Sequence, residues 1–176
     1  MVIKVLEKTK DCMPVDLPNG DWFDLRLAED VTLRGPFSKS LRRRTKDGQI
    51  VERFRDVVFS STLAKLGVSM ELPKDFEAIL LPRSSTFLKY GLLQGNSAGV
   101  IDYTYKGDDD EWMMIIVATR AITIPKGTRI AQFRIQPTQK ASMWAKLKWL
   151  FSSKIEFEKV ESLDNPDRGG FGHTGD

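Results

Sequence analysis

The chain has 176 residues, of which 41% are apolar and 29% charged, and its formal net charge is +3. These values are ordinary for one soluble globular domain, and no apolar run approaches the roughly 20 residues that a membrane span needs, so no membrane partner is expected. The single cysteine, Cys12, excludes an internal disulfide and fits a reducing cytoplasm, and with only one histidine the usual zinc ligand sets are excluded too.

The first unusual segment along the chain is residues 34–56, which are rich in charge and interrupt the strand-like pattern around them. We predict that they form a long hairpin or loop inserted between strands. The cations Lys39, Arg42, Arg43, Arg44 and Lys46 crowd one part of this segment. A solvated basic loop is the simpler interpretation, and contact with nucleic acid or another polyanion is the alternative. We expect no nucleic-acid partner.

Short apolar runs separated by turn residues follow. The runs are Val68–Leu72, Ala78–Leu81, Trp112–Ala118, Ala121–Ile124 and Arg129–Ile135. Residues 73–75, 106–110 and 125–127 combine Pro, Gly and Asp in the manner of turns. Short strands at close, turn-marked spacing predict an all-β sandwich or barrel. We expect residues 1–164 to form this single domain, with a second insert-like segment at 138–154.

That second insert contains a helical pattern. Over residues 141–151 the apolar side chains of Met143, Trp144, Leu147, Leu150 and Phe151 fall within one helical arc, so a short amphipathic helix is predicted. We expect this helix to pack on its own barrel or on a neighbouring subunit. Binding to a membrane surface is a weaker alternative at this length.

Two segments in the middle of the chain carry candidate chemistry. Arg83, Ser84 and Ser85 follow a strand and a proline, and they form a compact group of donors suited to anions. A structural turn in which the serines cap backbone groups is the alternative. Asp102 follows the apolar run 99–101, where a carboxylate can act as general base to a water molecule. Alternatively, Asp102 only opens the turn 102–107.

The C-terminus, residues 165–176, is predicted to be a glycine-rich flexible arm. Gly169, Gly170 and Gly172 leave backbone N–H groups free to approach a phosphate closely, and Phe171 offers a flat face to a base. A glycine-rich terminus is more often merely disordered. The arginine and the aromatic side chain interleaved with these glycines favour a binding role.

Five segments in order resemble the five motifs of the trimeric dUTP pyrophosphatase (dUTPase) family, in its bacterial and phage form. They are Asp21–Ala28, Pro82–Ser85, Gly95–Gly107, Gly127–Phe133 and Arg168–Gly175. The resemblance implies a jelly-roll-like β fold, a homotrimer with shared sites, and Mg²⁺-dependent hydrolysis of dUTP to dUMP and pyrophosphate. It also implies that Asp102 activates the water that attacks the α-phosphorus, with Arg83 orienting that carboxylate.

The same resemblance assigns the substrate contacts. Residues that would bind phosphate oxygens are Ser84, Ser85 and Gln132. Residues that would recognise uracil are Asn96, Val100 and Ile101. Tyr105 would pack on the deoxyribose and exclude a 2′-hydroxyl, and Asp24 would reach Mg²⁺ through water.

The fifth motif supplies the remaining contacts. Arg168 would pair with the γ-phosphate and Phe171 would stack on uracil, and further substrate contacts would come from Gly172, His173 and Thr174. Two features depart from the family pattern. Two residues are missing between Arg168 and Phe171, and His173 stands where a serine is common.

Two other functions remain as alternatives. A dCTP deaminase shares the fold but lacks the glycine-rich arm, which this chain has. A nucleotide-binding regulatory protein would instead use the 34–56 and 138–154 segments as surfaces for a protein partner.

Overall fold

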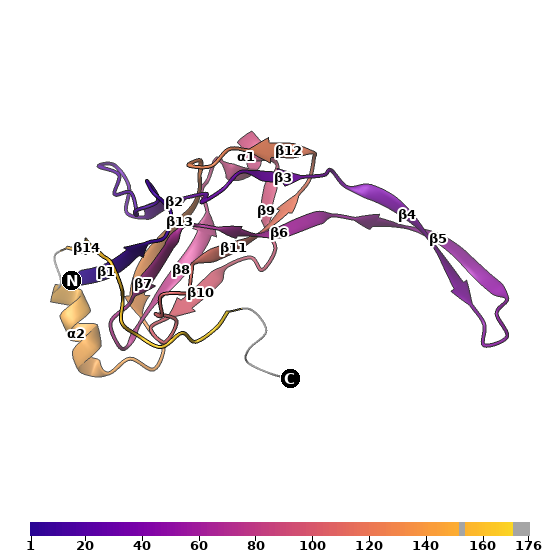
Figure 1. Cartoon of the computed structure of the whole chain (residues 1–176). Helices are drawn as coiled ribbons and strands as arrows, with labels where there is room; N and C mark the ends of the chain where they lie inside the picture. Colours follow the sequence, from indigo (N-terminus) through magenta and orange to yellow (C-terminus); the bar gives the residue numbers. More distant parts are fainter. Residues whose placement is uncertain (152–153, 171–176) are drawn as a thin grey trace.

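The structure is a computed structural model that describes residues 1–151 and 154–170. Its body is built almost entirely of short β-strands, as Figure 1 shows, and this confirms the all-β prediction. In the described ranges no helix has the length and apolar character that crossing a membrane would require.

The sheet that positions most of the candidate residues is antiparallel and has the strand order β10-β8-β13-β2. Its strands are β10 (Gly99–Asp102), β8 (Phe76–Pro82), β13 (Arg129–Pro137) and β2 (Phe23–Arg26). Buried residues alternate along β8, so Phe76, Ala78 and Leu80 point into the core. The register places Gly99 opposite Leu80 and Asp102 opposite Glu77.

Three smaller sheets complete the body. Their strands, in order, are β14 (Glu156–Val160), β1 (Val2–Glu7) and β7 (Val68–Glu71); β6 (Ser60–Lys65), β11 (Met113–Ala118) and β9 (Leu92–Gln94); and β12 (Ile122–Ile124) with β3 (Val31–Leu33). The core between them is aromatic and aliphatic, and the Trp112 ring meets the Phe133 ring edge-on with centroids 5.1 Å apart. β1 and β14 pair in parallel, so the two ends of the domain are joined.

The charged segment at 34–56 forms a hairpin, as predicted. β4 (Phe37–Arg44) and β5 (Ile50–Val58) pair only with each other and project from the body as a long two-stranded ribbon (Figure 1). We call residues 37–58 the β4–β5 ribbon. Nearly all of its side chains are exposed.

Two helices interrupt the strands, α1 (Thr86–Tyr90) and α2 (Met143–Phe151). The helix predicted at 141–151 is therefore confirmed as Met143–Phe151, and of the two packing partners expected for it, its own domain and a neighbouring subunit, its own domain covers only part of it. Only Ala145 and Trp149 contact the core, and the Trp149 ring lies 5.8 Å from that of Phe76. The side chains that remain exposed on one chain are Met143, Trp144, Leu147, Leu150 and Phe151.

Candidate active site

Asp102 ends β10, and three donor groups surround its carboxylate. Oδ1 accepts hydrogen bonds from the backbone N–H of Thr104 at 2.8 Å and from its hydroxyl at 2.5 Å. Oδ2 pairs with Nη1 of Arg168 at 2.6 Å. Burial raises the pKa of Asp102, but the bonds from Thr104 and the Arg168 guanidinium together hold that pKa below its ordinary value. Asp102 is therefore charged at neutral pH.

These contacts show that Asp102 does open a turn, as the alternative interpretation held, because Thr104 is bonded to it. A carboxylate has about four acceptor positions, and three are used here, two on Oδ1 and one on Oδ2. One position on Oδ2 is left for a further donor. Turn formation and the binding of a water molecule are thus compatible at Asp102.

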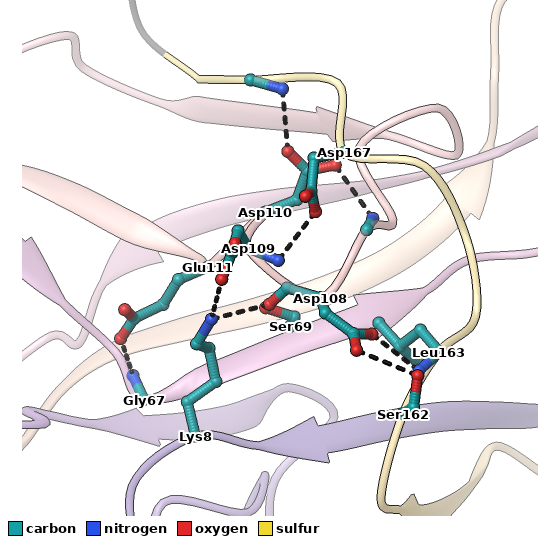
Figure 2. A network of polar contacts seen from close by, with 12 residues as sticks. Lys8, Gly67, Ser69, Asp108, Asp109, Asp110, Glu111, Ser162, Leu163 and Asp167 are labelled. Atoms are coloured by element: carbon teal, nitrogen blue, oxygen red, sulfur yellow. Dashed lines mark hydrogen bonds and ion pairs between the residues drawn. The ribbon is translucent and has the colours of Figure 1, made fainter.

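Asp110 is a residue that the sequence did not single out beyond its turn chemistry. Its carboxylate is 1% exposed and accepts the backbone N–H groups of Lys106, Gly107, Arg168 and Gly169, at 2.9 to 3.2 Å. It therefore joins the loop after β10 to the start of the C-terminal arm (Figure 2). Only a carboxylate can accept on both oxygens in this way.

Asp167, in the arm, forms a hydrogen bond in the opposite direction, to the backbone of the loop. Its Oδ1 accepts the backbone N–H of Asp109 at 2.8 Å. A Cβ at Gly107 would lie 2.1 Å from the same Oδ1 and 2.7 Å from the Asp167 nitrogen, so only glycine fits at Gly107. Loop and arm thus hold each other through reciprocal carboxylate-to-backbone bonds. We call this contact, between residues 106–110 and 167–169, the Asp110 clasp.

Asp108 forms hydrogen bonds with residues 162–163, which precede the arm. Asp108 accepts the hydroxyl of Ser162 at 2.9 Å and the N–H of Leu163 at 2.7 Å (Figure 2). Leu163 is 4% exposed. The described part of the predicted flexible arm, residues 165–170, therefore starts from a buried anchor and lies on its own subunit. Phe171, Gly172, His173 and Thr174 lie outside the described residues.

Tyr105 lies between the clasp and the core. Its hydroxyl donates to the carbonyl of Glu111 at 2.9 Å. Burial, together with the negative charges of Asp110, Glu111 and Asp167, raises its pKa to about 12, so the phenol stays neutral. A Cβ at Gly170 would come within 3.3 Å of this hydroxyl, which places the ring beside the arm.

The three residues expected at uracil lie on β10, the strand that Asp102 ends, and in the turn before it. Val100 is 62% exposed, while Ile101 packs against the core. Asn96 is exposed in the turn before β10, and its Oδ1 accepts from Nε2 of Gln94 at 3.2 Å. Asn96, Val100 and Asp102 thus follow one another along β10 and the turn before it, and Arg168 joins them through its ion pair with Asp102.

The phosphate candidates form a separate group beyond the other end of β8. Nε of Arg83 bonds Oδ1 of Asp24 at 2.9 Å, and Nη1 of Arg129 bonds Oδ2 at 3.1 Å. Gln132 donates to the carbonyl of Pro82 at 3.1 Å. Ser85 precedes α1 without a side-chain capping bond, so the capping interpretation does not hold for Ser85.

Within one chain these two groups are far apart. Asp102 lies opposite Glu77, near the start of β8, whereas Arg83 follows the last residue of that strand, Pro82. At about 3.3 Å per residue, Pro82 lies roughly 17 Å along the strand from Glu77. Arg83 bonds Asp24 and not Asp102. A single chain therefore does not bring the expected base together with the expected phosphate donors.

The environment of Asp24 does not fit a role at a metal-bound water. Its side chain is 2% exposed, and both oxygens are already bonded to arginines. In the described part of the chain no group of three or more His, Cys, Asp or Glu side chains could hold a metal ion. Asp24 instead anchors Arg83 and Arg129.

Comparison with known proteins bears on the family and fold of this chain. A family model described as dUTPase matches residues 52–175. The SPbeta prophage-derived deoxyuridine 5'-triphosphate nucleotidohydrolase YosS of Bacillus subtilis is 39% identical over 173 residues, covering 98% of this chain and 96% of that protein. The deoxyuridine 5'-triphosphate nucleotidohydrolase of Hydrogenobaculum is 35% identical over 119 residues, covering 66% of this chain and 72% of that protein.

Solved structures show the same fold. A dUTPase from Streptococcus mutans has a TM-score of 0.60 at 17% identity and covers 81% of this chain and 99% of its own. A dUTPase from phage phi11 of S. aureus, in which coordination of a structural Mg(II) ion is described, has a TM-score of 0.57 at 16% identity, covering 80% of this chain and 94% of its own. The five ordered motifs, the fold and the match over residues 52–175 lead to one conclusion: this chain belongs to the dUTPase family.

Proposed function

We propose that this dUTPase hydrolyses dUTP to dUMP and pyrophosphate in sites shared between the subunits of a homotrimer. The observation that carries this proposal is the separation of Asp102 from Arg83 along β8. A site that uses both residues must take them from different subunits. The single cysteine, Cys12, is buried and free, which supports a cytoplasmic location.

Asp102 acts as the general base. Its one remaining acceptor position, on Oδ2, takes a hydrogen bond from the attacking water beside Arg168. As the water oxygen bonds to the α-phosphorus, its proton passes to Asp102 and the bond to the bridging oxygen breaks, releasing pyrophosphate. A base placed in this way contributes about 10²–10⁴-fold to the rate.

The second group supplies the phosphate donors. Arg83 uses Nε on Asp24, so its two terminal nitrogens remain to contact a phosphate or the Asp102 of a neighbouring subunit. The hydroxyl of Ser84 is exposed and that of Ser85 is not used as a helix cap, so both can donate to phosphate oxygens. The buried Asp24 holds Arg83 and Arg129 in place as a positioning residue.

Uracil and sugar are recognised at β10 and the turns on either side of it. Val100 and Asn96 present exposed groups to the base. The Tyr105 ring, held through its hydroxyl to Glu111, faces the sugar and leaves no room for a 2′-hydroxyl. Mg²⁺ would enter with the substrate, on the triphosphate oxygens, and would supply neutralisation of the charge on the leaving pyrophosphate.

Mixed trimers test the sharing of sites. Arg83→Gln and Asp102→Asn chains, each inactive alone, should regain activity when co-expressed. In an equal mixture about a quarter of the sites would combine an intact Asp102 from one subunit with an intact Arg83 from another. dUTP turnover per trimer, with trimer mass from light scattering, measures this.

The control for that experiment mixes Asp102→Asn chains with chains that carry both substitutions. These trimers contain no intact Asp102 and should stay inactive. If the first mixture also stayed inactive while forming trimers, Asp102 and Arg83 would not act together across subunits, and the shared site would be wrong.

The ion pair between Arg168 and Asp102 predicts a change in pH dependence. The base works only when ionised, and Arg168 helps to hold the pKa of Asp102 below its ordinary value. Arg168→Gln removes that cation, so the pKa rises and the acid limb of the kcat/KM profile moves to higher pH. Steady-state rates on dUTP from pH 4 to 8 would show the shift.

Lys8→Gln provides the matched control, because Lys8 pairs with Asp109 in the same loop and not with Asp102. Its acid limb should coincide with that of the parent. A profile for Arg168→Gln that falls in height without moving on the pH axis would mean that Arg168 does not tune the base.

A further inference from the structure

The register of the β4–β5 ribbon sorts its side chains onto two different faces. Residues directly opposite each other in an antiparallel pair share a face, and successive residues alternate. One face, which we call the Arg face, carries Ser38, Ser40, Arg42 and Arg44 of β4 and Val57, Arg55, Arg53 and Ile50 of β5, where the register shifts between Arg43 and Arg44. The other face carries Phe37, Leu41, Phe54 and Val58, together with the opposed pairs Lys39–Asp56 and Arg43–Glu52.

The two faces differ sharply in charge. On the second face each cation lies opposite a carboxylate, and Arg43 approaches Glu52 at 4.0 Å. The Arg face has four arginines and no carboxylate. Residues 37–58 hold seven of the chain's 27 Lys and Arg but only three of its 24 Asp and Glu, so the ribbon's net charge of +4 exceeds the +3 of the whole chain.

The arginines of this face are available for binding. All four are exposed, and the ribbon points away from the body (Figure 1). Within residues 1–151 and 154–170, Arg42, Arg53 and Arg55 have no ion-pair partner, and Arg44 makes only a 3.5 Å contact to the carbonyl of Gly48. Concentrating four unpaired cations on one surface costs free energy through mutual repulsion unless an anion binds there.

We infer that the Arg face binds the phosphate backbone of duplex nucleic acid. The major groove of B-DNA, about 12 Å wide, admits a two-stranded β-ribbon. Successive rows of arginines, two residues apart along β4 or β5, are spaced by about 7 Å, which is twice the 3.4 Å axial spacing of phosphates on one strand. Guanidinium groups suit phosphate oxygens because they donate in pairs.

From the sequence we expected no nucleic-acid partner, and the strand pairing of the ribbon is the reason for proposing one. In the sequence the cations at 39–46 form one basic stretch in a loop. The pairing of β4 with β5 places Lys39 and Arg43 on the second face, opposite carboxylates. It also brings Arg53 and Arg55 beside Arg42 and Arg44 on the Arg face. Contacts of this kind go to phosphates, so binding should depend strongly on salt and little on base sequence.

The test measures binding of the full-length protein to a fluorescent 25-base-pair duplex by anisotropy, over a series of salt concentrations. The wild-type protein should bind, with the logarithm of affinity falling steeply as salt rises. Replacing the four arginines of the Arg face with glutamine should lower affinity at 50 mM salt by at least tenfold. It should also reduce the slope of log affinity against log salt by about 3 to 4 for each ribbon that contacts the duplex. Each lost phosphate contact contributes about 0.9 to that slope.

The matched control removes three cations from the same ribbon but not from this face, in the variant Lys39→Gln, Arg43→Gln, Lys46→Gln. It should keep duplex binding within about threefold, and both variants should keep full dUTP turnover. Absence of duplex binding by the wild-type protein, equal losses in the two variants, or equally tight binding of poly-glutamate would each overturn the inference. The last result would assign the face to an acidic protein instead.

Discussion

Asp102→Asn is expected to lower kcat on dUTP by about 10²–10⁴-fold, while binding of dUTP stays within a few fold of the parent. The amide keeps the size of the carboxylate, and its oxygen can still accept from Thr104, so the turn should persist. It cannot take a proton from water. Single-turnover rates together with nucleotide affinity from calorimetry separate the loss of chemistry from a loss of binding.

Two further variants isolate the cause of this loss. Asp109→Asn removes a carboxylate of the same loop that is exposed and paired with Lys8, and its turnover should match that of the parent. Asp102→Asn also breaks the ion pair with Arg168, so Arg168→Gln measures that contribution by itself. If Arg168→Gln lowered kcat at pH 8 as much as Asp102→Asn, the role of Asp102 would be to hold Arg168 of the arm, and not to activate the water. Near-parental turnover of Asp102→Asn would remove it from the mechanism altogether.

Deleting residues 167–176 is expected to lower kcat/KM by at least tenfold and to leave the trimer intact. Ordering a free arm costs roughly 1–2 kcal/mol per residue. The Asp110 clasp offsets part of that cost for residues 167–169 before substrate arrives, because four backbone N–H groups share one buried carboxylate. The deletion removes the bonds that the arm contributes to the clasp, together with Phe171 and the other residues that the fifth motif assigns to the substrate.

A variant of the full-length chain distinguishes the clasp from the arm itself. Asp110→Asn keeps every arm residue but replaces one acceptor oxygen by an amide group, which cannot accept an N–H. It should raise KM and lower kcat/KM in the same direction as the deletion, with a smaller effect. Light scattering and dUTP turnover, measured on the same samples, decide the matter. Full activity of the truncated trimer would make the arm dispensable, and dissociation of the trimer would make it a structural strap.

Local patterns in the sequence were enough for much of this molecule. Runs such as 78–81 and 129–135 are short, apolar and bounded by turn residues, and both are strands in the sheet that carries the candidate residues. The charged segment at 34–56 was predicted as a long hairpin or loop because it breaks the strand pattern, and residues 37–58 form a hairpin. Five ordered motifs were sufficient to indicate the family, since motif order is a property of the chain and needs no coordinates.

The sequence could not show which distant groups meet. Asp110 was predicted only as part of a turn, but it accepts N–H groups from the arm, more than 50 residues further along the chain. Arg83 was expected to orient Asp102 in a site shared between subunits. Within one chain the antiparallel register of β8 and β10 leaves the two residues at opposite ends of β8, and Arg83 bonds Asp24. Neither contact could be predicted from the local sequence. Every residue except proline has a backbone N–H, and strand register does not depend on amino-acid composition.

The β4–β5 ribbon shows most clearly which features follow from the sequence and which from the tertiary structure. Composition by itself indicated that residues 34–56 would form a charged hairpin or loop with solvated basic side chains. Only strand pairing decided that Arg53 and Arg55 would join Arg42 and Arg44 on one face while Glu52 and Asp56 balance the cations of the other. The physical reason is that side chains alternate with a period of two, so a shift of one residue in register would exchange the faces of an entire strand.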